Sequence, residues 1–321
     1  MTAATGLYLG IDGGGSRVRT LALDLDLGSR SAREHEVPAD FSSIPGAEVL
    51  DALEQAARSA WEGQARVADC AFAGIAGCVT ADQRDAVVTR LLSIGIARSV
   101  VVHHDAYTTW FGATGGRPGV IVIAGTGSSV FTVDPGGGEL LVGGFGAVFG
   151  DEGSGSDLGR EALRAAAAAE DGYGPGERLR RAVLEALGIG SMREAMDLQH
   201  ASEAGWLARL APRLLDLAGG GDPAAQAILR SRLGCLADQI AVAVDACDPS
   251  SPTPVFGAGS LFMNDRYLDG LATAVRERRP RATLQRSARA PVEGAVLAAV
   301  ARAPGADGTG LERALELLAS R

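Results

Sequence analysis

The chain carries two turns rich in glycine and hydroxyl residues, and each lies between two apolar strands. The first is Gly10-Ile11-Asp12-Gly13-Gly14-Gly15-Ser16. The residues after it alternate like a strand, so it is not the strand-to-helix turn of a dinucleotide-binding fold. Successive glycines allow backbone N–H groups to approach an anion, although a plain hairpin turn is the simpler alternative. Asp12, at the strand end, could hold Mg²⁺ through water.

The second turn is Gly125-Thr126-Gly127-Ser128, which offers hydroxyls and further N–H groups. Alone it is a common sequence. Paired with the first turn it predicts two clamps on one polyphosphate, a recurrent arrangement for phosphoryl transfer. A third turn, Gly257-Ala258-Gly259-Ser260, follows a strand and has two interpretations. It is either a close backbone approach to a flat adenine or a tight strand-to-helix turn.

Asp105 ends one predicted strand and opens a predicted helix. Because Asp is a common N-cap residue, helix capping is one role for it. Strand ends of α/β sheets also collect catalytic groups, and there the carboxylate could deprotonate a hydroxyl that attacks a γ-phosphate. We expect the preceding His103 and His104 to be packing or solvent-facing residues, because no second cluster supplies metal ligands.

The stretch from Gly143 to Ser156 combines many glycines with two acidic residues, Asp151 and Glu152, directly before a predicted helix. Polar side chains among glycines form a suitable contact set for a polyhydroxylated ligand. Alternatively, the two carboxylates only complement the positive end of the helix dipole.

The composition excludes several classes of protein. None of the 321 residues is Lys, which excludes a Walker A P-loop, a protein kinase and Schiff-base chemistry. The net charge of −9, without a basic run, makes nucleic acid and anionic membranes poor partners. The sequence shows neither a signal peptide nor an apolar run long enough to span a membrane, so we expect a cytoplasmic protein. The four cysteines lie far apart, which predicts reduced, buried thiols.

The elements that would position these residues repeat along the chain. The first half reads βββαβαβα, with its second helix starting at Thr80, where Thr80 and Gln83 form a capping box. After a candidate hinge at Gly115–Pro118, the strand, turn and strand pattern begins again. This weak repeat predicts a duplicated α/β fold with a ligand cleft between two lobes. We place the N-terminal lobe at 1–116 and the C-terminal lobe at 117–321, with a helical insertion at about 171–250; the last helix could pack back on the N-terminal lobe.

Together, the motifs GIDGGGSR, HDA, AGTGS, GGFGAVFGDEGS and VFGAGS resemble the BadF/BadG/BcrA/BcrD ATPase family over essentially the whole chain. Within that family they are most similar to kinases of N-acetylglucosamine and glucosamine. The GDEGS block, with the glycine-rich residues that precede it, is the motif most specific to this family. The resemblance implies the two-lobed actin/hexokinase/Hsp70-like fold, which is ribonuclease H-like, with Mg²⁺, ATP and a hexosamine in the cleft. It implies transfer of the γ-phosphate to the sugar's 6-hydroxyl, and it leaves a homodimer open.

The resemblance also implies roles for individual residues. It makes Asp105 the catalytic base and Asp151 a ligand of the sugar hydroxyls. The residues implied to bind ATP and its metal are Asp12, Gly13, Gly14, Gly15, Ser16, Arg17, Thr126, Gly127, Ser128, Gly257, Gly259 and Ser260. Those implied to contact the sugar are Ser42, Ser43, Asp105, Gly127, Ser129, Gly144, Phe145, Asp151 and Glu152.

Two positions depart from the pattern of the sugar kinases. Relatives commonly carry an Asn in the loop before the first long helix, where this chain has Ser42 and Ser43, and an Asn after GTGS, where it has Ser129. A lost amide removes a donor and an acceptor that could read the sugar's 2-substituent.

Two other functions stay as alternatives. One is an ATPase that activates a dehydratase through an iron–sulfur cluster, although Cys70 and Cys78 do not have the spacing of cluster ligands. The other is a non-catalytic sensor of a sugar or nucleotide.

Overall fold

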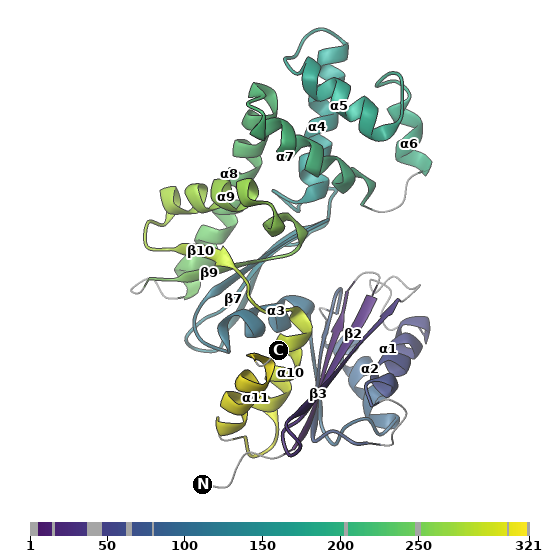
Figure 1. Cartoon of the computed structure of the whole chain (residues 1–321), viewed down its shortest axis with the longest axis vertical. Helices are drawn as coiled ribbons and strands as arrows, with labels where there is room; N and C mark the ends of the chain where they lie inside the picture. Colours follow the sequence, from purple (N-terminus) through teal and green to yellow (C-terminus); the bar gives the residue numbers. More distant parts are fainter. Residues whose placement is uncertain are drawn as a thin grey trace. The chain divides into compact units, whose positions relative to one another are not determined.

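The computed structural model describes residues 6–14, 17–36, 47–61, 66–78, 80–201, 205–247, 252–306 and 308–319. The chain forms two compact units (Figure 1). The first comprises Met1–Arg117 and Ser287–Arg321, and the second comprises Pro118–Arg286. The last two helices of the chain, within Ser287–Arg321, therefore belong to the first unit. The division predicted from the sequence instead assigned 117–321 to the second lobe and expected only the last helix to pack on the first.

The first unit is built on a five-stranded sheet in the order β3-β2-β1-β4-β5. β1, β2 and β3 pair antiparallel, whereas β4 and β5 continue the sheet parallel to β1. The strands are β1 (Leu7–Gly13), β2 (Arg17–Asp24), β3 (Ser29–Glu36), β4 (Cys70–Ile75) and β5 (Val100–His103). The helices are α1 (Ala47–Ser59), α2 (Ala81–Ser93), α3 (Asp105–Thr114), α10 (Pro291–Arg302) and α11 (Thr309–Ala319).

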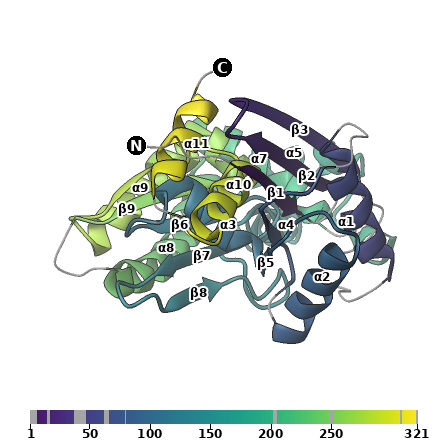
Figure 2. The same cartoon turned by 90° about the horizontal axis from the view of Figure 1, so that it is seen from below.

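Helices cover both faces of this sheet (Figure 2). α1 and α2 close one face over an apolar core, and α3 and α10 pack on the other. α10 can lie against α3 because Gly294 touches the Thr108 carbonyl so closely that any Cβ would collide with it. The capping box predicted at Thr80 is present, with the Gln83 N–H donating to Thr80 Oγ1 at 3.3 Å and Gln83 Oε1 accepting from the Thr80 N–H at 2.9 Å.

The second unit repeats the topology of the first. Its sheet has the order β10-β9-β6-β7-β8, in which β6 takes the central place of β1, β7 and β8 form the antiparallel arm, and β9 and β10 the parallel one. The strands are β6 (Val120–Ala124), β7 (Ser128–Val133), β8 (Glu139–Gly143), β9 (Pro254–Ala258) and β10 (Thr283–Arg286). This correspondence confirms the duplicated α/β fold predicted from the sequence.

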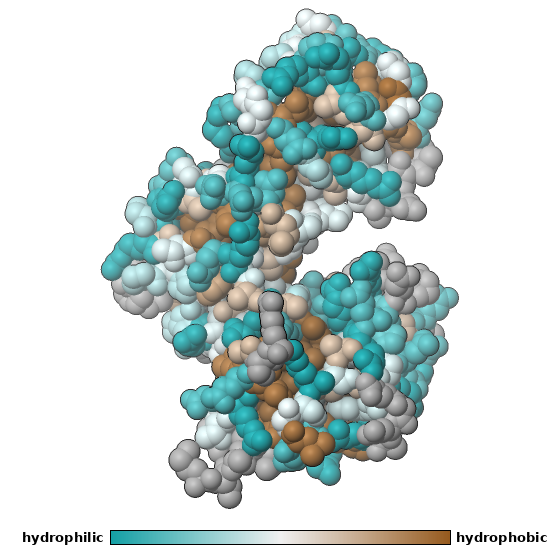
Figure 3. Space-filling model, viewed as in Figure 1, coloured by the Kyte–Doolittle hydropathy of each residue, from teal (hydrophilic) through white to brown (hydrophobic). Residues whose placement is uncertain are grey.

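Helices make up most of the second unit outside its sheet. They are α4 (Gly155–Glu170), α5 (Glu177–Leu187), α6 (Ala195–Ala201), η2 (Trp206–Leu210), α7 (Ala211–Gly219), α8 (Pro223–Cys247), η3 (Ser260–Met263) and α9 (Asp265–Arg278). Each unit has its own apolar core. Figure 3 shows hydrophilic residues over much of the face that it displays. Among the described helices of either unit, none is long and apolar enough to cross a membrane.

Candidate active site

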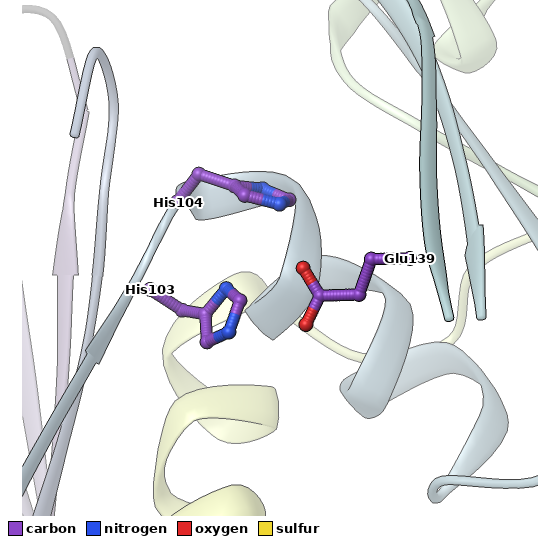
Figure 4. A group of neighbouring side chains, drawn as sticks. All are labelled: His103, His104 and Glu139. Carbon is purple, nitrogen blue, oxygen red and sulfur yellow. The ribbon is translucent and has the colours of Figure 1, made fainter. Parts of the chain in front are cut away.

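Asp105 is the first residue of α3. It follows His103, the last residue of β5, and His104, and Figure 4 shows the side chains of these two histidines. The N-cap position belongs to His104, whose side chain makes no capping hydrogen bond. Asp105 therefore lies one residue inside the helix and is not the N-cap considered from the sequence. Its carboxylate accepts hydrogen bonds from the backbone N–H groups of Ala106 and of Asp105 itself. The unpaired N–H groups and dipole of a helix N-terminus stabilise a negative charge at such a position.

Gly74 on β4 brings the start of α3 close to the end of β1. Asp12 pairs with Gly74, and Gly74 pairs with His103, so the ends of three parallel strands lie side by side. A Cβ on Gly74 would collide with the Thr108 side chain. Thr108 Oγ1 in turn donates to the Asp105 carbonyl at 2.8 Å. Gly74 was not among the site residues predicted from the sequence, although a glycine inside a buried strand is a known signal of close approach by another segment.

Burial and a neighbouring charge shift the protonation of Asp12, and burial shifts that of Asp105. Burial and, to a smaller extent, the negative charge of Asp105 raise the pKa of Asp12 to about 7, against the lowering effect of Arg19. Desolvation also raises the pKa of Asp105, against the lowering effect of its two backbone hydrogen bonds. Two carboxyl groups with raised pKa values in one place are typical of a functional site, because a purely structural arrangement would favour paired or solvated charges.

Arg19 is a member of this site that the sequence analysis did not name. It is the strand partner of Asp12 in the β1–β2 hairpin, and its Nη1 lies 3.9 Å from Asp12 Oδ2. Arg19 also donates from Nε to Glu34 Oε2 at 2.9 Å. The hairpin register could have identified it, since residues directly opposite each other on two antiparallel strands share a face.

His103 and His104 are packing residues, as expected from the sequence. The His103 ring stacks on Tyr107 with 4.3 Å between ring centroids and meets the edge of His104 at 5.2 Å. Burial, followed by the positive charge of Arg84, lowers the pKa of His103 to about 3 and that of His104 to about 4. Both imidazoles are therefore neutral at pH 7.

The first glycine turn is a hairpin turn between β1 and β2. The Gly14 N–H donates to the Arg17 carbonyl at 2.9 Å, and the Ala76 N–H donates to the Gly13 carbonyl at 2.8 Å. Arg17 itself pairs with Glu34 at 2.7 Å. Four residues that the sequence analysis assigned to ATP or sugar lie outside the described residues, namely Gly15, Ser16, Ser42 and Ser43.

The second glycine turn joins β6 to β7 and is fixed to the start of α4. The carbonyls of Gly125 and Thr126 accept from the N–H groups of Gly155 at 2.8 Å and Ser156 at 3.1 Å. Ser128 is buried, and its hydroxyl donates to the Glu152 carbonyl at 2.8 Å. In contrast, Thr126 is exposed. Within this turn, Thr126 and the Gly127 backbone are thus better placed than Ser128 to meet a ligand.

Asp151 adopts an unusual backbone conformation in the loop before α4. Its φ of 60° is the only positive φ of a non-glycine residue in the described part of the chain. The side chain is buried, and it accepts hydrogen bonds from the N–H groups of Gly146, at 3.3 Å, and Ser128. Desolvation nevertheless raises the pKa of its carboxyl. A strained Asp held by backbone donors is characteristic of a functional loop.

Other predicted sugar contacts surround Asp151 in the second unit. Gly144 packs against Ser129, since a Cβ on Gly144 would lie 3.2 Å from that of Ser129. The exposed Phe145 stacks on Phe149 with 6.1 Å between ring centroids. Glu152 differs from the others, because its Oε2 accepts from Gln239 Nε2 on α8 at 2.6 Å.

The third turn, residues 257–260, lies next to the second. It begins with the last two residues of β9, which pairs with β6 in parallel with Ala258 opposite Ile123. The ends of both strands consequently meet, and a Cβ on Gly125 would lie 3.5 Å from Ser260 Oγ. The second unit thus gathers two backbone turns and the Asp151 loop at one edge of its sheet.

Comparison with known proteins decides the family. The model of the BadF/BadG/BcrA/BcrD ATPase family matches residues 9–300, which is nearly the whole chain. The chain belongs to this family. The family resemblance proposed from the sequence motifs is thereby confirmed, and membership in this ATPase family implies the use of ATP.

Similar family members carry the names of sugar kinases. The N-acetyl-D-glucosamine kinase of Dictyostelium discoideum is 26% identical over 314 residues, covering 92% of this chain and 98% of that protein. The N-acetylmuramic acid/N-acetylglucosamine kinase of Clostridium acetobutylicum is 29% identical over 195 residues, which span 59% of this chain and 62% of that relative. A crystal structure of a candidate N-acetylglucosamine kinase from Chromobacterium violaceum is 30% identical, with a TM-score of 0.72 over 91% of this chain and 98% of that one. Hexokinase and ROK-family structures below 25% identity share the fold, which confirms the actin/hexokinase-like fold class.

Proposed function

We propose that this BadF/BadG/BcrA/BcrD-family protein is an ATP-dependent amino-sugar kinase that phosphorylates the 6-hydroxyl of N-acetylglucosamine or glucosamine. The observation that carries the proposal is the Asp105 carboxyl, which lies in the first turn of α3, next to Asp12, with a raised pKa. The names of its relatives, which act on N-acetylglucosamine or N-acetylmuramic acid, support the same reaction class.

In this proposal Asp105 accepts the proton of the attacking sugar hydroxyl. The sugar oxygen forms a bond to the γ-phosphorus, the bond from that phosphorus to the bridging oxygen breaks, and ADP leaves. A general base is most effective when its pKa lies near the working pH, and desolvation shifts the pKa of Asp105 in that direction. The hydroxyls of Thr108 and Thr109 hold the Asp105 backbone in place through its carbonyl, at 2.8 and 2.9 Å.

Asp12 would hold Mg²⁺ through water. A carboxylate at a strand end suits this hard cation, and a group whose pKa burial raises to about 7 is one whose ionised form a cation would stabilise. When bound, Mg²⁺ supplies charge neutralisation on the phosphates. The Gly127 backbone N–H and the Thr126 hydroxyl would bind phosphate in a chain that has no Lys, whereas the Gly14 N–H of the first turn is already donated to the Arg17 carbonyl.

The sugar would be recognised by the Asp151 loop. Asp151 presents a carboxylate to sugar hydroxyls, with Ser129 and Gly144 beside it and Phe145 offering an aromatic face. The turn at 257–260 would contact the adenosine. Glu152 would act by holding the loop to α8 through Gln239.

The cysteines favour a kinase over a dehydratase activator. Cys70 and Cys78 are buried, and burial raises the pKa of both thiols, which opposes the thiolate form that iron–sulfur ligation needs. Cys247 is buried as well, and Cys235 is half-buried.

The test is ADP release from Mg²⁺ and ATP with four sugars in parallel, namely glucosamine, N-acetylglucosamine, N-acetylmuramic acid and glucose. We expect one or more amino sugars to raise ADP release far above the rate without sugar. A rate of ADP release that is the same with and without each sugar would contradict the proposal. If the purified protein were also brown and contained iron, the result would support a dehydratase activator.

A further inference from the structure

The loop between β8 and α4 exposes apolar side chains close to the buried Asp151. Phe145, Val148 and Phe149 are 66%, 92% and 76% exposed. Apolar side chains hold a segment in place when they are buried against other apolar groups, and these three are not. Polar contacts therefore have to hold this loop in its observed conformation.

Arg160, in the second turn of α4, supplies such a contact. Its Nη1 donates to the Ala147 carbonyl in the middle of the loop, and its Nη2 donates to Asp157 Oδ1 at 2.7 Å. The loop also closes on itself, because the Gly150 N–H donates to the Gly146 carbonyl at 2.9 Å. The planar fork of a guanidinium can make two such bonds at once. Arg160 thus joins the middle of the loop to the first turn of α4.

Asp157 is a fixed anchor for this guanidinium. It is only 2% exposed, and its Oδ2 accepts from the Gly153 N–H at 2.8 Å and from Arg232 Nε on α8 at 2.9 Å. A buried carboxylate is stable when it is paired and hydrogen-bonded in this way. Because Arg232 would still pair with Asp157 in a variant without Arg160, we expect such a variant to free the loop without unfolding α4.

The loop that Arg160 holds also orients Asp151. The N–H of Gly146, next to Ala147, donates to Asp151 Oδ1 at 3.3 Å. Burial raises the pKa of Asp151, and the positive charge of Arg160 is one of the smaller effects that lower it, so the guanidinium is near enough to act on this carboxyl. A displacement of Ala147 would therefore displace a donor that fixes the Asp151 side chain.

We propose that Arg160 is a positioning residue for the sugar, which fixes the loop that orients Asp151 by holding Ala147 to Asp157. This inference rests on the proposed function, in which Asp151 binds the sugar hydroxyls. Arg160 acts through the loop and not by contact with the sugar or ATP. Its loss should therefore weaken the binding of the sugar and leave the binding of ATP and the chemical step nearly unchanged.

Limited digestion with chymotrypsin tests the hold on the loop without any enzymatic activity. This protease cleaves after aromatic residues in segments that open locally, so Arg160→Gln should speed cleavage after Phe145 or Phe149 at least about fivefold. The masses of the fragments identify the cleaved bond. Cleavage after Tyr173, which is 77% exposed and lies outside the loop, is the internal reference and should keep its rate.

Steady-state kinetics test the effect on the sugar. Arg160→Gln should raise KM for the amino sugar at least about tenfold, while kcat and KM for ATP stay within about twofold of the wild type. Arg160→Lys keeps a charged donor for either the Ala147 carbonyl or Asp157, so its KM for the sugar should lie between those of Arg160→Gln and the wild type. Arg164→Gln is the matched control and should behave as the wild type in both assays, because Arg164 pairs with Glu161 at 2.7 Å one turn further along α4.

Two results would overturn the inference. One is an equal rate of loop cleavage in Arg160→Gln and Arg164→Gln. The other is an unchanged KM for the sugar in an Arg160→Gln variant whose loop is cleaved faster. A wild-type protein whose ADP release no sugar stimulates would instead contradict the proposed function, and the cleavage rates would still decide whether Arg160 holds the loop.

Discussion

Gly127 and Asp151 share one small space in the second unit. A Cβ added to Gly127 would lie 2.6 Å from Asp151 Oδ2, a distance that no real Cβ tolerates. The Asp151 backbone is left-handed, and the N–H groups of Ser128 and Gly146 hold its carboxylate. The positions of Gly127 and Asp151 are therefore coupled, since moving one moves the other.

Gly127→Ala should displace Asp151 and lower kcat/KM for the sugar by at least about tenfold. The added methyl group overpacks the turn, which also costs about 1–3 kcal/mol of stability. Steady-state kinetics with varied sugar and urea unfolding measure the two effects. Gly234→Ala on α8 is the matched control, since its Cβ would meet only the mobile end of Arg278 at 3.4 Å. Equal activity of the two variants would refute the coupling.

Gly74→Ala should displace Asp105, the proposed base, without a direct contact between the two side chains. The new Cβ collides with Thr108, whose hydroxyl binds the Asp105 carbonyl, so α3 must shift. Because a small misplacement of a catalytic group is costly, we expect kcat to fall at least about tenfold. Rates at saturating sugar and ATP measure this effect. Unchanged kcat in a folded variant would mean that the start of α3 does not need its observed position.

Local signals in the sequence predicted element boundaries well. Thr80 caps its helix as the capping box with Gln83 indicates, because a cap involves only four consecutive residues.

The remaining features depend on contacts between distant segments. The return of α10 to the first unit rests on its close packing against Thr108 and β1, which no local pattern reports. Asp151 has a positive φ, and its carboxylate accepts hydrogen bonds from Gly146 in the same loop and from Ser128 on β7. Glu152 meets Gln239 from 87 residues away. The candidate acids could thus be named from the sequence, whereas their protonation and their supporting residues could not.

Asp12 should make the protein less stable as the pH rises. Its pKa is about 7 in the folded state and 3.8 in its ordinary state, so the folded protein binds the extra proton between these values. The free energy of unfolding therefore falls from pH 4 to pH 7.5, by up to about 4 kcal/mol from this group. Asp12→Asn should lose less stability than the wild type over this range in urea unfolding without Mg²⁺. If the free energy of unfolding changed with pH by the same amount in both proteins, Asp12 would not be protonated in the folded state.

His103 should act in the opposite direction. Its pKa is about 3 in the folded state and 6.5 in its ordinary state, so the unfolded chain binds more protons below pH 6.5. The folded protein consequently loses stability as the pH falls from 6.5 toward 3. His103→Phe keeps a ring to stack on Tyr107 and should lose less stability than the wild type between pH 7 and pH 4.5. If both proteins lose the same amount, the imidazole is not a buried neutral group.

The most direct test of the catalytic account is the rate of sugar-dependent ADP release by Asp105→Asn. This change keeps the size of the side chain and removes the base, so kcat should fall by roughly 10²–10⁴ while the melting temperature stays near that of the wild type. Asp85→Asn on α2 is the control and should keep the full rate. A folded Asp105→Asn variant that phosphorylates the sugar at the wild-type rate would contradict the proposal that Asp105 is the catalytic base.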